Sequence, residues 1–151
     1  MIYVVEVEFP PKQYPVPGMA PKTRLWMSRS AISVDQAFYK RKRVDALKFW
    51  NKIDSCCRVG LNNYSGTVLK KEKGYDGVFR FGIRLLNYRF YGFFHGTEFI
   101  VPEADEKPGD MGPLQREACE RVAKIFKGIT PWVKVENERY NRPAPRYPDA
   151  G

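Results

Sequence analysis

The 151-residue sequence contains one histidine and three cysteines, and this scarcity limits the kinds of site that it forms. Cys56 and Cys57 are adjacent and Cys119 lies far along the chain, a spacing that fits neither a zinc site nor a disulfide framework. The single histidine, His95, adds at most one further metal ligand. We therefore expect a reduced protein that holds no metal ion and no other cofactor.

Long hydrophobic runs are also missing from the sequence. No apolar stretch approaches the roughly 20 residues that a membrane-spanning helix needs. The N-terminal segment, MIYVVEVEF, holds two glutamates where a secretory signal has a basic head. We expect a cytoplasmic protein without a membrane partner.

Acidic residues are the minority among the charges. Lys and Arg number 26 and Asp and Glu number 17, which gives a formal net charge of +9. This balance is typical of a basic surface and also suits an acidic partner such as nucleic acid, and charge alone does not separate the two. The length allows one domain with a hydrophobic core and is short for two domains.

The most regular pattern in the chain is an alternation of apolar and polar residues between Gly77 and Val101. It predicts three consecutive antiparallel strands, over Val78–Leu85, Tyr88–Phe94 and Thr97–Val101. The face opposite the apolar side carries three cations: Arg80, Arg84 and Arg89. Cations and aromatic rings on one sheet surface suit a polyanion with bases that stack.

Other segments predict the elements around this meander. Ile2–Phe9 alternates as a strand. Val34–Arg58 has the spacing of an amphipathic helix, with Ser33 as its N-cap, and a break near Arg43 would make it a helical hairpin. Pro113–Lys127 has the pattern of a final helix. The expected fold class is α+β.

The remaining segments are rich in proline or in charge. We expect one domain over residues 1–131, a proline-rich basic insertion at 10–33, and a C-terminal tail at 132–151. An acidic loop is expected over 102–112. The run Lys40–Arg43 is either the wet face of a helix or a contact for RNA, and three lysines precede the meander: Lys70, Lys71 and Lys73.

Several short motifs, taken in order, resemble the RelE/HigB toxin superfamily and above all its phage-type HigB branch. The likeness covers about residues 44–127. The motifs are Val68-Leu69-Lys70-Lys71, Gly77-Val78-Phe79-Arg80-Phe81, Tyr88-Arg89-Phe90, Phe93-Phe94-His95-Gly96, Ile100-Val101 and the helix from Pro113 to Val122.

This resemblance implies a fold and an activity. The fold would be RelE-like, with a small antiparallel sheet packed against helices. The activity would be a toxin-like mRNA endonuclease, acting on the ribosome or on free mRNA and neutralised by an antitoxin. Such an enzyme needs no metal, because the ribose 2′-hydroxyl attacks the adjacent phosphate while side chains move protons and stabilise the oxyanion.

The resemblance also assigns roles to individual residues. Arg89 matches the arginine of the Tyr-Arg motif and is expected to clamp the scissile phosphate. The expected catalytic residues are Arg89, Lys71, Arg84 and Tyr91. The expected RNA-binding residues are Lys70, Lys73, Arg80, Arg41 and Lys42.

The chain departs from the family pattern at two places. Gly82 stands where the family often has an arginine, and an acidic segment, Pro102–Lys107, replaces a segment with a histidine, an aromatic residue and lysines. Carboxylates repel RNA phosphates. Two alternatives therefore stay open: a RelE-like protein without cleavage activity that binds RNA or a host protein, and an unrelated small basic RNA-binding domain.

Overall fold

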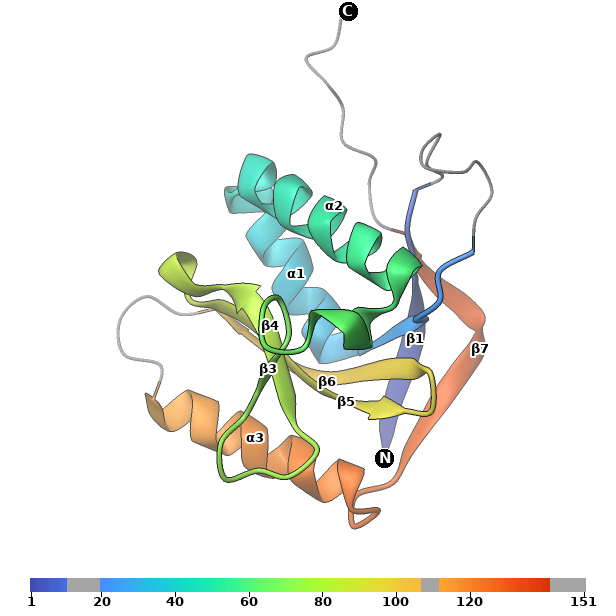
Figure 1. The fold of residues 1–151 in the computed structure, drawn as a ribbon, viewed down its shortest axis with the longest axis vertical. Coiled ribbons are helices and arrows are strands. Elements are labelled where there is room, and N and C mark those ends of the chain that lie inside the picture. The colour runs from blue at the N-terminus through green and yellow to red at the C-terminus, as the bar shows by residue number, and fades with distance from the viewer. Residues whose placement is uncertain (11–19, 107–111, 142–151) are drawn as a thin grey trace, which may run out of the picture.

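The computed structural model describes residues 1–10, 20–106 and 112–141. Within these ranges the chain is α+β, with a seven-stranded sheet and three α-helices (Figure 1). The elements are β1 (Ile2–Glu8), β2 (Leu25–Ser28), α1 (Arg29–Arg41), α2 (Arg43–Val59), the 3-10 helix η1 (Leu61–Tyr64), β3 (Lys70–Lys71), β4 (Phe79–Ile83), the 3-10 helix η2 (Arg84–Leu86), β5 (Tyr88–His95), β6 (Glu98–Glu106), α3 (Gly112–Phe126) and β7 (Trp132–Asn141).

The strand order across the sheet is β3-β4-β5-β6-β2-β1-β7. The pairs β3/β4, β4/β5, β5/β6 and β2/β1 are antiparallel, whereas β6/β2 and β1/β7 are parallel. The expected antiparallel meander is confirmed as β4, β5 and β6. The sheet as a whole is larger than the small antiparallel sheet that we expected, and it is mixed.

Helices cover both faces of the sheet. In Figure 1, α1 and α2 lie on one face and α3 lies on the other. The first core is aromatic: Phe49 of α2 stacks on Phe81 and Phe90, and Trp50 packs edge-on against the same two rings. The second core, between the sheet and α3, contains Tyr91. Trp50 is thus part of the core.

Two segments that we expected to be irregular contain strands. The insertion predicted at 10–33 holds β2 and the start of α1, and the tail predicted at 132–151 forms β7 as far as Asn141. β2 is four residues long and wholly buried, so it shows no alternation. β7 pairs with β1, starting from Trp132 opposite Ile2, and the ring of Trp132 packs against Phe93. Residues 11–19 and 142–151 lie outside the described residues.

The helical region differs from the prediction at its start. The helix begins at Arg29, and the side chain of Ser28, not Ser33, accepts the capping hydrogen bond from the Ala31 amide at 3.1 Å. The break is confirmed at Lys42, between α1 and α2. Val44, an apolar residue within the predicted amphipathic helix, is exposed.

The acidic segment predicted as a loop begins as sheet. β6 continues through Glu106, so residues 102–106 extend the strand. Residues 107–111 are outside the described ranges. In the described part of the chain, no helix is long and apolar enough to cross a membrane.

Candidate nucleic-acid interface

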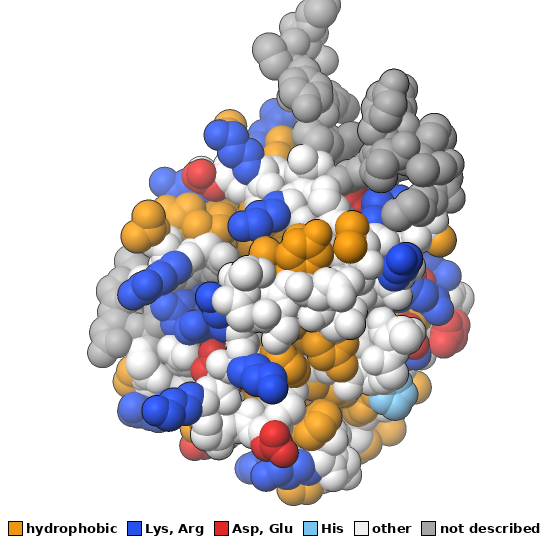
Figure 2. All heavy atoms as spheres, viewed as in Figure 1, with side chains coloured by type: hydrophobic (Ala, Val, Ile, Leu, Met, Phe, Trp, Pro, Cys, Tyr) orange, Lys and Arg blue, Asp and Glu red, His pale blue; other side chains and the backbone are white. Residues whose placement is uncertain are grey.

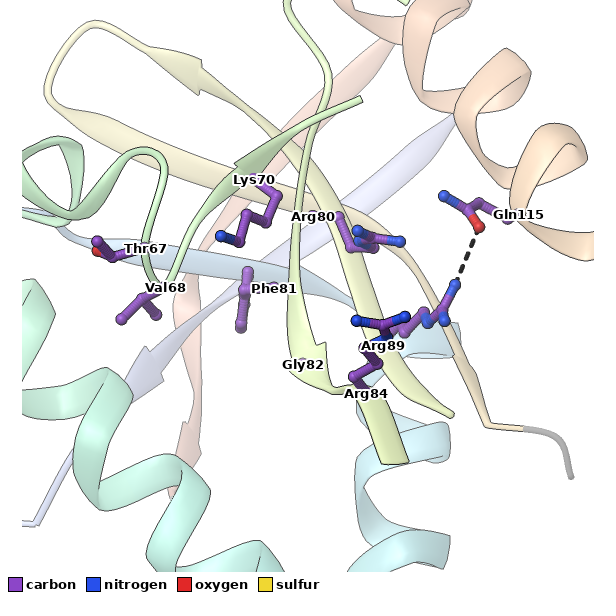
Figure 3. A pocket seen from close by; sticks show the side chains of 9 residues that line it. All are labelled: Thr67, Val68, Lys70, Arg80, Phe81, Gly82, Arg84, Arg89 and Gln115. Carbon is purple, nitrogen blue, oxygen red and sulfur yellow. Dashed lines mark hydrogen bonds between the residues drawn. The ribbon is translucent and has the colours of Figure 1, made fainter. Parts of the chain in front are cut away.

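A pocket of about 570 Å³ opens between the β3–β4 hairpin, the start of β5 and the first turn of α3 (Figure 3). Four of its lining side chains are cations that the sequence had suggested. The full lining is Thr67, Val68, Lys70, Arg80, Phe81, Gly82, Arg84, Arg89 and Gln115.

Strand register explains why these cations meet. Arg80 lies opposite Lys70 on one side and opposite Tyr91 on the other, and Gly82 lies opposite Arg89. Side chains at paired positions of neighbouring strands point to the same face. Lys70, Arg80 and Arg89 therefore share the face on which α3 packs.

Gly82 is required by the close approach of β4 to β5. A Cβ atom at this position would lie 2.0 Å from the Tyr88 carbonyl oxygen and 2.9 Å from the Arg89 Cα. No side chain fits there without moving a strand. The glycine at this position thus has a local steric reason.

Arg84 reaches the pocket from a turn and not from a strand. The expected strand Val78–Leu85 ends at Ile83, and η2 then carries Arg84 before Asn87, whose φ of 48° is left-handed. This tight turn places the exposed Arg84 beside Arg89 at the end of the hairpin (Figure 3).

Two arginines are held by one hydrogen-bonded chain. The Gln115 carbonyl oxygen accepts from Arg89 Nη1 at 2.9 Å, and the Gln115 amide donates to Glu72 at 2.9 Å. The other Glu72 oxygen lies 3.2 Å from Arg80 Nε, and the Glu72 side chain is only 8% exposed. Four cations and this carboxylate leave the group a formal charge of +3, so the pocket attracts anions.

The side chains of Lys70 and Lys71 point to opposite faces of the sheet because the two residues are neighbours in a strand. Lys70 lines the pocket, and its ammonium group donates to the Gly66 carbonyl at 2.7 Å. Lys71 pairs with Phe79 and lines a different hollow of about 580 Å³, together with Lys73. The structure therefore does not bring the expected catalytic Lys71 or the expected RNA-binding Lys73 to the arginines.

Tyr91 is likewise not a pocket residue. It is fully buried beneath α3, and burial, reinforced by the charge of Asp105, raises the pKa of its hydroxyl to about 12. The Tyr91 hydroxyl and one oxygen of Asp105 have no hydrogen-bond partner within the described ranges. The structure therefore does not bring Tyr91, an expected catalytic residue, into the pocket with the arginines.

The acidic strand end adjoins the cations. Asp105 lies opposite Arg89 in the β5–β6 ladder. Burial, with the nearby charge of Glu103, raises the pKa of the Asp105 carboxyl. The next residue, Glu106, forms an ion pair with Arg41 at the end of α1. The expected contacts Arg41 and Lys42 thus lie at the α1–α2 junction outside the pocket, where Lys42 is exposed.

Sequence reasoning missed Glu72 and Gln115, which position the arginines. Gln115 is 26 residues from Arg89 and 43 from Glu72, and a lone glutamine at the start of a helix gives no functional signal. His95 lies at the opposite end of β5 from Arg89, with its ring against Trp132, and so takes no part in the pocket.

Comparisons of the chain with protein-family models, with curated proteins and with solved structures found no match. The chemistry of the pocket is therefore inferred from its own residues and their surroundings. Figure 2 shows Lys and Arg side chains spread over this face of the molecule, with few Asp and Glu among them. Such a face attracts long anions as well as single ones.

Proposed function

We propose that this chain binds RNA through the pocket lined by Lys70, Arg80, Arg84 and Arg89, on a scaffold similar to that of RelE/HigB toxins. The observation that carries the proposal is the convergence of these four cations in one concave site. Guanidinium groups bind phosphate oxygens in a planar, forked geometry, and the network through Gln115 holds two of them in place before a ligand arrives.

The order of the elements supports the likeness to that superfamily. A strand, two helices, a three-stranded meander and a helix occur in this order as β2, α1, α2, β4–β6 and α3, with η1 and β3 between α2 and β4. The first strand of this order is β2 and not the strand expected over Ile2–Phe9, which is β1. The lysine ahead of the hairpin and the Tyr-Arg start of β5 lie in this order. The strands β1 and β7 are additions outside it.

A salt titration of RNA binding tests the proposal. Fluorescence anisotropy with a short single-stranded RNA would compare the wild type with the double variant Arg84→Gln/Arg89→Gln. Each phosphate contact adds about 0.7 to the slope of log affinity against log salt for a single strand, so the slope should fall by about 1.4. The control variant Lys48→Gln/Lys52→Gln removes the same charge from the exposed face of α2. Equal losses in both variants would reject the pocket as the site.

Metal-independent RNA cleavage, as in a toxin-like mRNA endonuclease, is a second candidate function. The observation that favours it is that Lys70 faces the same pocket as Arg80 and Arg89. In this reaction the 2′-oxygen bonds to phosphorus as it loses its proton, and the bond to the 5′-oxygen breaks as that oxygen gains one. The arginines would stabilise the added negative charge, and Lys70 would move a proton.

Product analysis separates cleavage from binding. Wild-type protein would be incubated with mRNA in the presence and absence of ribosomes, with chelator throughout. If cleavage occurs, Lys70→Ala should lower its rate about 10²–10³-fold with a much smaller change in RNA affinity. If the wild type leaves the RNA intact, the function that remains is binding, either of RNA or of a host protein or antitoxin.

A further inference from the structure

The pocket has two chemically different ends. In Figure 3, Thr67 and Val68 lie on one side, Arg84, Arg89 and Gln115 lie on the other, and Lys70 and Phe81 lie between them. At the first end Thr67 and Val68 are uncharged and the Lys70 ammonium donates to the neighbouring Gly66 carbonyl, whereas the second end holds the arginines. A ligand that fills the whole pocket would therefore place an anionic group among the arginines and, at the other end, a group that packs on Val68 and accepts a hydrogen bond from Lys70.

The end of the pocket at Thr67 and Val68 is a hydrogen-bonded turn. The backbone amides of Thr67, Val68 and Leu69 all donate to the Tyr64 carbonyl, at 3.1, 3.1 and 3.0 Å, and the Thr67 hydroxyl donates to the same oxygen at 3.0 Å. These N–H groups are used within the turn, so they do not form a nest for an anion. Besides the Lys70 ammonium, this end offers a ligand the exposed part of the Val68 side chain, which is half-buried because it packs against the first core.

We propose that the pocket binds one nucleotide unit of single-stranded RNA in a fixed orientation, with the phosphate among Arg80, Arg84 and Arg89 and the base against Thr67 and Val68. This inference rests on the proposed function, because it names the ligand of the same site. The ribose separates base from phosphate, as Lys70 and Phe81 separate the two ends of the pocket. A volume of about 570 Å³ falls within the roughly 300–1,000 Å³ of ligand pockets.

The orientation also selects the kind of RNA. A base in a duplex is paired and stacked, so it cannot rotate outward to contact the recessed surface at Val68. An unpaired base can do so. The contact with Val68 is apolar and not directional, and we therefore expect it to accept any base with modest preference. It adds affinity without adding a phosphate contact.

Two six-nucleotide oligomers with the same number of phosphates test this inference. One is a mixed-sequence RNA strand, and the other is a ribose-phosphate strand that lacks all bases. The wild type should bind the strand with bases about five- to tenfold more tightly, with the same salt slope for both. Val68→Ser removes the apolar contact and should abolish this preference while leaving the affinity for the baseless strand unchanged. Val68→Thr keeps the side-chain volume, so it should fold like the wild type and reduce the preference partly.

Leu85 is the matched control, because it is apolar, 95% exposed and located in η2 next to Arg84. Leu85→Ser should leave the preference for bases intact. The inference is overturned if the wild type binds both strands equally, or if Leu85→Ser and not Val68→Ser removes the preference. In that case, salt-dependent binding of the baseless strand would still support the proposed function. Failure to bind either strand would reject both the proposed function and this inference.

Discussion

The two faces of the β4–β5 hairpin come from the same strands and have opposite environments. Toward α1 and α2, Phe81 and Phe90 are buried against aromatic rings. Toward α3, the alternating positions are Arg80, Gly82 and Arg89, which are not buried. Two helices close the first face, whereas α3 covers the second only partly. One alternating sequence thus builds both the core and the site, and the incomplete cover by α3 leaves room for the pocket.

The largest expected effect lies on the closed face. Phe90→Ala removes a fully buried ring that contacts both Phe49 and Phe81, and the cavity should lower the free energy of unfolding by about 3–5 kcal/mol. Urea denaturation measures this change. RNA affinity, measured at a temperature where the variant is folded, should stay within twofold of wild type. A large loss of affinity in the folded variant would mean that the two faces are not independent.

The next effect lies at the point where the strands approach most closely. Gly82→Ala places a methyl group against the Tyr88 carbonyl and should destabilise the fold by about 1–3 kcal/mol, because β4 and β5 must separate. RNA affinity should fall as well, since Arg89 moves with β5. Gly96→Asn is the control: Gly96 has a left-handed φ of 61° that asparagine tolerates, and nothing lies within 4 Å of a Cβ there. A Gly82→Ala protein with the stability of the wild type would show that β4 and β5 can separate without loss of free energy of unfolding.

A smaller effect should follow from breaking the chain that holds the arginines on the open face. Gln115→Leu removes both hydrogen bonds of the amide, so Arg89 loses its acceptor and Glu72 loses a donor. We expect RNA affinity to fall about tenfold, near 1.4 kcal/mol, with the salt slope unchanged because no cation is lost. Glu120→Gln, at an exposed position of the same helix, should have little effect. A change in the salt slope with Gln115→Leu would assign the glutamine a different role.

The strands of this hairpin were predictable from the sequence because alternation is a local signal. The same signal placed Arg80 and Arg89 together. It failed for β2, which is buried on both faces and four residues long, and for β7, an edge strand with many exposed charged residues. A local sequence pattern does not reveal a strand whose extended conformation depends on pairing with strands that are distant in the sequence.

The candidate site was predictable only in part, for the same reason. Lys71 was expected to be catalytic and Lys70 to bind RNA, but the pairing of Lys70 with Arg80 places Lys70 and not Lys71 at the pocket. Tyr91 shares the face of Arg80, yet α3 covers it, so its burial depends on tertiary packing. Gln115 joins the site over a long sequence separation that no motif encodes.

The smallest effect concerns the carboxyl group beside the open face. Asp105 lies opposite Arg89 in the strand ladder. The charged groups that act on its pKa are Glu103 and Glu117, which raise it, and Arg121, which lowers it. Burial raises this pKa in the folded state, so the folded protein holds the Asp105 proton more tightly than the unfolded chain does. The stability that the protonated group contributes is complete below the pKa of the unfolded chain and is lost as pH rises through the raised folded value.

Asp105→Asn removes this pH-dependent loss. The variant should match the wild type in strongly acidic solution and become the more stable protein as pH rises toward neutrality, which thermal unfolding at a series of pH values would measure. The same substitution removes a negative charge next to Arg89, so RNA affinity at neutral pH should rise by roughly two- to fivefold, the size of a partly exposed charge interaction. Glu120→Gln makes an equal change in net charge away from the pocket and should give a smaller rise. Lower stability of Asp105→Asn at neutral pH would instead mean that the ionised carboxylate stabilises the fold by pairing with Arg89, and the acidic end of β6 would then belong to the binding machinery rather than oppose it.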